Sequence, residues 1–424
     1  MKKVAVVVGA LIFIFFTVSV FAGGLEKSVS KQGISEENKI QKAEDQVEQS
    51  LDKFEHTDTH LLHREEGAPS FFLDGFRIGA GATIVVQGTD DVNGDNSPEN
   101  EAVTDVSFSA DLEIEKEFKD IGKAFLHFEI GQGEGIDNDL KVFSNVNQDA
   151  FDEKEGRVAE LWYEHYLSDS ALITLGKLDP TVYFDNNALA NDETTQFLGG
   201  IFSNSPVIEF PDNSEGIRLS FAPIEALEFS LGYFDANSKW EDKFQHTFMA
   251  GQINIKPNLL KRNGNYRFLV WSNDTDHTKW EDSTQNKEKA YGFGLSFDQE
   301  LTDILAAFFR YGWQDPECYK NEEEFSLESS WSVGLQVNGK LWGRENDVLA
   351  LAVGQVIPSD DYKKSNSALR AKTEGHFETY YNCKINDHLS IGPDIQFIWD
   401  PYGSDASIKD QSIGIYGMRV QIDF

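Results

Sequence analysis

The feature of this sequence that most constrains its fold is a two-residue hydrophobic period that starts near residue 71 and runs to the C-terminus. Successive side chains of a β-strand point to opposite faces, so this period predicts strands with one apolar and one polar face. About sixteen segments follow the period. They are residues 75–88, 104–118, 121–133, 157–167, 171–178, 216–222, 227–236, 244–256, 266–274, 291–299, 303–314, 329–337, 348–357, 375–385, 389–399 and 411–424.

The connections between these segments alternate between short and long. The short ones include "KD", "SDS", "PIEA", "ELT" and "NDH", whereas "TDDVNGDNSPENEAV" and "NDTDHTKWEDSTQNKEKA" are long and acidic. Short periplasmic turns that alternate with long extracellular loops are typical of an outer-membrane barrel, and an even number near sixteen encloses an aqueous channel. The sequence therefore predicts an all-β fold, a transmembrane antiparallel barrel over residues 70–424.

The two faces of each predicted strand differ in the way a membrane requires. In "EGIRLSFA", Ile217, Leu219 and Phe221 share one face, and Arg218 and Ser220 share the other. A charge that faces lipid at the bilayer midplane costs roughly 2–4 kcal/mol, so the charged faces must line a wet lumen. An ordinary half-buried strand explains any one segment, but it does not explain about sixteen such segments in an exported chain.

The N-terminus predicts export. Lys2 and Lys3 precede an apolar stretch over residues 4–21, and Ala22 follows at a position that signal peptidase reads. We expect a signal peptide over residues 1–22, with a retained anchor helix as the alternative. Export followed by a barrel predicts the cell outer membrane as the location, with membrane lipids and the barrel-assembly machinery as partners.

Residues 23–69 form an acidic, polar spacer between the signal peptide and the barrel. Ile40, Val47, Leu51 and Phe54 are spaced like the apolar seam of a coiled coil, but the segment is short. A short coiled coil and a solvated spacer with nascent helix both remain open. The chain as a whole carries 72 acidic and 37 basic residues, a formal charge of −35, which argues against nucleic acid as a partner.

The longest connection, residues 179–215, is too apolar for a solvated external loop. It contains Tyr183, Phe184, Phe197, Phe202 and Phe210. Such a loop needs a surface to pack against, and the inner wall of a wide barrel provides one. We therefore expect this loop to fold inward, where it narrows the channel.

Three motifs in the barrel region carry a family resemblance. "GKLDPTVYFDNNALANDETTQFL", "FPDNSEGIRLSF" and "GPDIQFIWDPYG" resemble the OprB-like carbohydrate-selective porins, from about Phe71 to Phe424. The resemblance implies a sixteen-stranded outer-membrane barrel through which small sugars diffuse inward, and porins as a class imply a homotrimer. The acidic spacer does not belong to the family pattern.

The predicted lumen offers groups that suit sugars, since charged and amide side chains bond hydroxyls and aromatic rings cover sugar faces. Arg218 has two interpretations that remain open, a donor at the pore constriction or a partner for wall carboxylates. The predicted pore-lining residues are Glu129, Glu160, Trp162, Glu164, Asp185, Asn187, Asp192, Arg218, Arg267, Trp271, Arg310, Asp394 and Gln396.

The last ten residues, "IYGMRVQIDF", predict the closing strand of the barrel. Tyr416 and Phe424 lie on its lipid-facing side, and a terminal aromatic residue after such alternation resembles the signal that the barrel-assembly machinery reads. We therefore expect Tyr416 and Phe424 to act in assembly rather than in transport.

No pattern predicts an enzyme, a metal site or a cofactor. "DVNGDN" resembles part of a calcium loop, but position twelve is Ala102 rather than an acid. Cys318 and Cys383 have no metal-binding spacing, and either free thiols or a pair remain possible. Besides the sugar porin, two functions stay open: a general cation-preferring porin, and a structural barrel that links the envelope through its spacer.

Overall fold

The computed structural model of the chain describes residues 70–73, 75–94, 102–238, 242–259, 261–321, 325–406 and 412–424. The predicted signal peptide, residues 1–22, and the predicted spacer, residues 23–69, lie outside the described residues. The described part of the chain contains the whole predicted barrel apart from short gaps.

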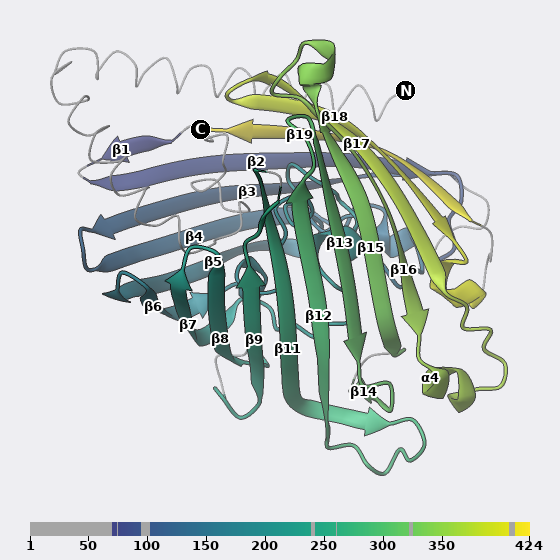
Figure 1. Cartoon of the computed structure of the whole chain (residues 1–424). Coiled ribbons are helices and arrows are strands. Elements are labelled where there is room, and N and C mark those ends of the chain that lie inside the picture. The colour runs from purple at the N-terminus through teal and green to yellow at the C-terminus, as the bar shows by residue number, and fades with distance from the viewer. Residues whose placement is uncertain are drawn as a thin grey trace, which may run out of the picture. The chain divides into compact units, whose positions relative to one another are not determined.

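Sixteen long antiparallel strands form a closed barrel in the described part of the chain (Figure 1). They are β2 (Phe76–Thr89), β3 (Val103–Phe118), β4 (Gly122–Gly133), β5 (Phe151–Ser168), β6 (Ala171–Leu178), β7 (Ser214–Ile224), β8 (Leu227–Asp235), β9 (Thr247–Ile255), β11 (Arg262–Lys279), β12 (Glu288–Glu300), β13 (Leu305–Gln314), β15 (Leu327–Asn338), β16 (Val348–Pro358), β17 (Glu374–Asn386), β18 (Leu389–Trp399) and β19 (Ile413–Asp423). Each predicted segment corresponds to one of these strands. The prediction of a sixteen-stranded antiparallel barrel is thus confirmed.

The barrel closes between its last and first long strands. β19 pairs with β2 in antiparallel register from Tyr416 opposite Gly88 to Asp423 opposite Gly81. The backbone of Phe424 continues this seam, because its N–H donates to the Ala80 carbonyl at 2.7 Å and its carbonyl accepts from the Ala80 N–H at 2.9 Å. Closure leaves the long strands of the wall without an open edge, as a membrane barrel requires.

Two strands extend further than their hydrophobic period predicts. β5 begins at Phe151 instead of residue 157, and β11 covers residues 262–279 instead of 266–274. Apart from Phe151, the extensions are polar, and a strand that continues beyond the apolar band needs no alternation to keep its backbone hydrogen bonds. Three short strands, β1 (Phe71–Leu73), β10 (Asn258–Leu259) and β14 (Cys318–Lys320), also pair with the wall.

The strand faces have the predicted orientation. On β7, Ile217, Leu219 and Phe221 are 48, 40 and 45% exposed, whereas Arg218 and Ser220 are buried. β18 and β19 show the same contrast between an apolar outer face and a polar inner face. The outer face suits contact with lipid, and the polar side chains point toward the lumen.

In the described residues, helical structure is confined to short segments between strands. They are η2 (Asp137–Asp139), η3 (Pro180–Val182), α3 (Gly200–Ser203), η4 (Gly339–Trp342), α4 (Asp360–Ser365) and η5 (Pro401–Ser404). Ser359 begins α4, where its Oγ accepts a hydrogen bond from the Tyr362 N–H at 3.0 Å. Across the described residues, no helix has the length and apolar character needed to cross a membrane.

The two cysteines lie on β14 and β17 and are both free. Cys318 is buried, and Cys383 is partly buried, where its Sγ contacts the Arg344 guanidinium at 3.2 Å. Of the two possibilities left by the sequence, the structure therefore has free thiols rather than a pair.

Candidate functional site

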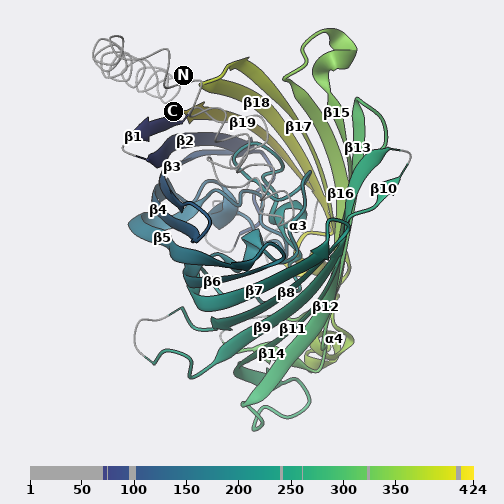
Figure 2. The ribbon, with the colours of Figure 1, turned by 60° about the vertical axis from the view of Figure 1, so that its left-hand side comes forward.

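The connection between β6 and β7 enters the barrel instead of leaving it. Figure 2 shows its short helix α3 inside the ring of strands. The loop starts with a capped turn, since the Asp179 carboxylate accepts from the Thr181 N–H at 2.8 Å and Pro180 is the first residue of η3. The predicted inward fold of this loop, hereafter the long loop (residues 179–213), agrees with the structure.

Aromatic side chains of the long loop pack against the inner wall. The Phe197 ring lies 4.9 Å from that of Tyr380 on β17 and 5.8 Å from that of Phe308 on β13. Earlier in the loop, Phe184 lies 6.0 Å from Phe234 on β8. These edge-to-face contacts bury the apolar side chains that made the loop unfit for a solvated position.

Arg310 on β13 fastens the middle of the long loop. Its guanidinium donates to the carbonyls of Phe202, Asp185 and Ala190 at 2.5, 2.9 and 3.0 Å. Its Nε lies 3.1 Å from Oδ2 of Asp185, and both side chains are fully buried. Burial raises the pKa of Asp185, although Arg310 opposes the shift. The planar guanidinium thus binds several loop groups at once.

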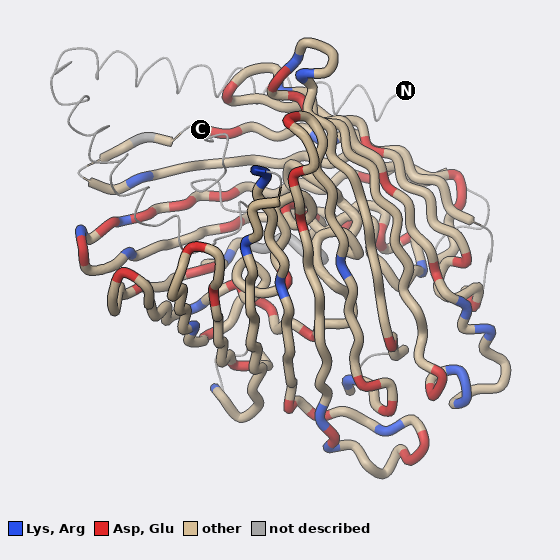
Figure 3. Tube along the Cα trace, viewed as in Figure 1, with Lys and Arg blue, Asp and Glu red and all other residues tan. Residues whose placement is uncertain are grey.

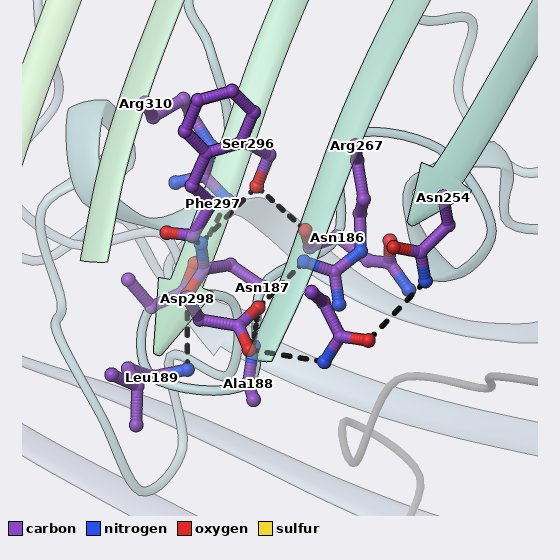
Figure 4. A network of polar contacts seen from close by, with 12 residues as sticks. Asn186, Asn187, Ala188, Leu189, Asn254, Arg267, Ser296, Phe297, Asp298 and Arg310 are labelled. Atoms are coloured by element: carbon purple, nitrogen blue, oxygen red, sulfur yellow. Dashed lines mark hydrogen bonds and ion pairs between the residues drawn. The ribbon is translucent and has the colours of Figure 1, made fainter. Parts of the chain in front are cut away.

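A polar network joins the start of the long loop to β11 and β12 (Figure 4). Asn187 donates to Oγ of Ser296 at 3.1 Å, and Ser296 donates to the Asn186 carbonyl at 2.7 Å. Between the two wall strands, Arg267 on β11 donates to Asp298 on β12 at 2.6 Å. These residues connect to one another rather than to the open lumen.

Residues 193–199 of the long loop are held by β17 and β19. The Glu378 carboxylate accepts from the backbone N–H groups of Leu198 and Gly199 at 2.6 and 2.9 Å. Arg419 donates to the carbonyls of Glu193 and Gln196, each at 2.7 Å. Buried charged groups of the wall therefore satisfy backbone groups that would otherwise be left unbonded inside the barrel.

Glycines on the inner wall let the loop approach closely. A Cβ on Gly312 of β13 would lie 2.3 Å from Oγ of Ser205 and 2.5 Å from a methyl of Val207. A Cβ on Gly232 of β8 would lie 2.8 Å from the Phe184 ring. At these two positions a larger residue would have to displace the loop.

A second segment also enters the lumen, between β4 and β5. Glu374 on β17 accepts from the N–H groups of Phe143 and Ser144 at 2.9 Å and from the Tyr402 N–H at 2.7 Å. Gln396 on β18 donates to the Val146 carbonyl at 2.9 Å. We call residues 137–150 the second inward segment.

The two inward segments leave a cavity of about 820 Å³ beside β3, β4 and β5. The strands form one side of the cavity, and the long loop and the second inward segment form the other. Its volume is in the range of sites that bind small molecules. We call this space the lumen cavity.

The lumen cavity is strongly acidic. The described residues that line it include nine carboxylates and a single arginine, Arg157. Asp and Glu recur along β3 (Figure 3), and β4 adds Glu129. The carboxylates are Asp111, Glu113, Glu129, Asp149, Glu160, Asp179, Asp192, Glu193 and Asp212.

Apolar side chains complete the lining. Phe143 and Phe151 come from the second inward segment and the start of β5, and Ile201, Ile208 and Phe210 come from the long loop. Polar groups and ring faces therefore meet the same space, an arrangement that suits molecules with hydroxyl groups and apolar ring faces.

Three of the residues proposed from sequence line the lumen cavity: Glu129, Glu160 and Asp192. Glu129 forms an ion pair with Arg157 at 2.8 Å, and Glu160 accepts from the Asp179 N–H at 3.0 Å. Asp192 accepts from the N–H and Oγ of Thr194 at 2.9 and 2.6 Å, so its carboxylate also shapes the long loop.

The other proposed pore residues lie outside the lining of this cavity, because they are buried within the long loop, beneath the inward segments or within the wall. Arg218 donates to Glu228 at 3.0 Å and lies over the Tyr183 ring, which agrees with the wall-partner interpretation. Trp162 stacks on Phe125 at 5.0 Å. Those covered by the inward segments or by packing within the wall are Trp162, Glu164, Asp185, Asn187, Arg218, Arg267, Trp271, Arg310, Asp394 and Gln396.

The sequence did not single out the second inward segment. Its apolar Phe143 and Val146, in an otherwise polar link, carry the same signal as the aromatic residues of the long loop. Asp111 and Asp149, which line the cavity, had no distinguishing pattern among the many acids of the chain.

Comparison with known proteins identifies relatives in one family. The family described as "Carbohydrate-selective porin, OprB family" matches residues 95–424. The high-pH structure of OprB from Pseudomonas putida is similar with a TM-score of 0.69 and 16% identity, over 82% of this chain and 94% of that one. The channel DcaP of Acinetobacter baumannii is similar with a TM-score of 0.52 and 11% identity, over 84% of this chain and 99% of that one.

Two curated proteins match by sequence. Porin AaxA of Chlamydia caviae is 24% identical over 238 residues, which are 54% of this chain and 48% of the relative. An uncharacterized protein of Aquifex aeolicus is 23% identical over 225 residues, which are 53% of this chain and 58% of the relative. The match thus spans about half the length of these relatives.

Proposed function

Because the chain belongs to the OprB family of carbohydrate-selective porins, we propose that it lets small sugars diffuse passively across the outer membrane. The protein is an outer-membrane β-barrel, and its family and fold indicate a channel rather than an enzyme. Solutes would cross the water-filled lumen without a cofactor. Their binding would be weak enough for release on the far side.

The lining of the lumen cavity supports this proposal. Its carboxylates and amides can bond the hydroxyls of a sugar, and Phe143, Phe151 and Phe210 can cover an apolar ring face. Because both kinds of group line this cavity, a solute that enters it would contact both.

Liposome swelling tests the sugar preference. Liposomes that contain the purified protein are diluted into isotonic mono- and disaccharides, and into neutral amino acids of similar size. We expect faster swelling with sugars than with amino acids of equal size. Equal rates at equal size would identify a general porin instead.

A general cation-preferring porin is the second candidate, and the acidic lining of the lumen cavity favours it. Nine carboxylates against one arginine would concentrate cations in the path. Reversal potentials in planar bilayers under a salt gradient measure this preference. An anion preference would exclude the candidate, and a cation preference without sugar preference would support it over the first.

Assembly partners and oligomeric state are also part of the proposal. We expect cleavage of the signal peptide, insertion by the barrel-assembly machinery and a homotrimer, by analogy with porins as a class. Because Phe424 continues the β19–β2 seam through two backbone hydrogen bonds, we expect its deletion to lower the yield of folded barrel before transport changes. The measurement is the heat-modifiable band on a gel, and a normal yield would contradict the assembly role.

A further inference from the structure

The acidic residues of the lumen cavity are concentrated where β3, β4 and β5 run side by side. Asp111 on β3 lies directly opposite Glu129 on β4 in the strand register, and Glu129 lies opposite Arg157 on β5. Like charges in directly opposite positions destabilise a sheet. Glu129 is partly neutralised by Arg157 at 2.8 Å, and Asp111 lies 2.8 Å from His127 Nε2.

A third carboxylate, on the second inward segment, joins these two. Oδ1 of Asp149 accepts from Oγ of Ser109 at 2.7 Å, which holds the carboxylate over β3 beside Asp111. Among the described residues, Oδ2 of Asp149 has no hydrogen-bond partner, although Asp149 is only 5% exposed and lines the cavity. An unpartnered buried carboxylate oxygen is costly unless a cation or donor arrives to bond it.

The electrostatic environment of Asp149 supports a cationic ligand. Burial raises the pKa of Asp149 well above its ordinary value, the hydrogen bond from Ser109 opposes the shift, and Asp111 and Glu129 raise it further. A positive group placed between these carboxylates would relieve both the repulsion and the loss of solvation.

An apolar ring lies beside the same carboxylates. Phe151 lines the cavity, and its ring packs over Gly131, two residues after Glu129 on the same face of β4. The guanidinium of Arg157 lies 5.7 Å from the centre of the Phe151 ring. A cation alone can also lie over a ring face, but only a sugar ring adds an apolar face that covers the Phe151 ring at the same time.

From these contacts we infer that Asp111, Glu129 and Asp149, together with the ring of Phe151, form a binding site for protonated amino sugars on the permeation path. The ammonium group would bond Oδ2 of Asp149, and the sugar ring would lie against Phe151. This inference rests on the proposed sugar permeation and specifies the class of sugar that passes with greatest preference.

Single-channel recording with three related sugars tests the site. The full chain is reconstituted in planar bilayers, and D-glucosamine, N-acetyl-D-glucosamine and D-glucose are added in turn. We expect glucosamine to interrupt the ion current at about tenfold lower concentration than either neutral sugar, which equals about 1.4 kcal/mol. Equal concentrations for all three would overturn the inference.

Two substitutions and a control place the effect at this site. Asp149→Asn keeps the shape of the side chain and should abolish most of the glucosamine preference, whereas Asp387→Asn removes one acid from an exposed turn and should leave it unchanged. Loss of the preference in both variants would show a general charge effect and overturn the inference. If Asp149→Asn fails to fold, the wild-type contrast between glucosamine and N-acetylglucosamine still decides.

Methylammonium separates the ring contribution from the charge. We expect glucosamine to bind more tightly than methylammonium, because its sugar ring covers more of the Phe151 ring than a single methylammonium group does. Equal binding would overturn the sugar part of the inference. The failure of the proposed function looks different: neutral sugars would then show no preferential swelling, whatever the result with cationic solutes.

Discussion

The two sides of the lumen use charged residues in opposite ways. On the side of β11 to β19, Arg310, Glu378 and Arg419 are buried beneath the long loop, and each bonds backbone groups of that loop. On the side of β3 to β5, Arg157 and Glu129 face the lumen cavity. One side therefore holds the loop in place, and the other presents its charges to whatever passes.

This difference shows that an inward-facing charge is not by itself a pore-lining charge. Arg310 and Arg157 both sit on inner faces of strands, yet the Arg310 side chain is 2% exposed and that of Arg157 is 37% exposed. The difference comes from the long loop: Arg310 lies beneath it, whereas Arg157 faces the lumen cavity. Energetically they also differ, since breaking a buried pair costs about 3–5 kcal/mol and a partly exposed pair contributes only about 0–1 kcal/mol.

The largest effect is expected from removing Arg310, on the side of β11 to β19 that holds the long loop. In Arg310→Met, three loop carbonyls lose a buried donor, and the Asp185 carboxylate loses its cationic partner and keeps only the Ser205 N–H among the described contacts, at a cost of about 3–5 kcal/mol. We expect the long loop to leave its place, with higher and noisier single-channel conductance. The measurement is conductance in planar bilayers at fixed salt.

Arg157→Met is the matched control on the other side. The chemical change is the same, but the only ion pair lost among the described contacts of Arg157 is the partly exposed one to Glu129. Conductance noise should stay near the wild-type level while cation preference rises, because one positive charge leaves an acidic cavity. Similar noise in both variants would refute the division of the lumen into two sides.

A smaller effect is expected from Gly312→Ala, which tests how closely the long loop packs against β13. The new methyl group would meet Ser205 and Val207 at 2.3 and 2.5 Å, and overpacking of this kind costs about 1–3 kcal/mol. We expect the barrel to unfold at a lower temperature in a heat-modifiability assay. Gly414→Ala, whose Cβ would meet no atom of the described residues within 4 Å, should leave that temperature unchanged.

The smallest effect expected is a change of cation preference with pH, caused by Asp149 in the lumen cavity. Because burial together with Asp111 and Glu129 raises the pKa of Asp149, against the opposing effects of Ser109 and Arg419, this carboxyl gains its proton at higher pH than an exposed one. Its negative charge is present above the raised pKa and is lost as the pH falls through it. As the pH is lowered, cation preference should therefore begin to decline at a higher pH than the one at which exposed carboxylates gain their protons.

Reversal potentials measured over a pH series check this prediction. Asp149→Asn should weaken the early part of the decline, to which Glu193 also contributes because burial raises its pKa well above the ordinary value. The later part, which belongs to the other carboxylates of the cavity, should remain. An identical pH profile in the variant and the wild type would mean that Asp149 does not contribute to the potential in the path.

The fold could be predicted from sequence because the membrane imposes a simple rule on each strand. Apolar side chains such as Ile217 must alternate with polar ones such as Arg218, and the rule holds for every long strand without knowledge of its neighbours. The inward path of the long loop was also predictable, since Phe197 and Phe202 need a surface to pack against.

The lining of the cavity could not be predicted in the same way. Whether an inner-face residue meets water or a covering loop depends on tertiary contacts far apart in the chain, such as that between Arg310 and Ala190. Trp271 and Glu129 alternate correctly on their strands, yet the first is packed away and the second lines the cavity. Periodicity carries no information about that choice.

The placement of the lumen cavity has a consequence for how selectivity is inherited. Its described lining begins at Asp111 and ends at Asn213, so a single continuous stretch of about a quarter of the chain supplies all of it. The remaining strands complete the ring and anchor that stretch. A porin built this way can change its solute by recombination or drift within one block of its gene, while the rest of the barrel is left intact.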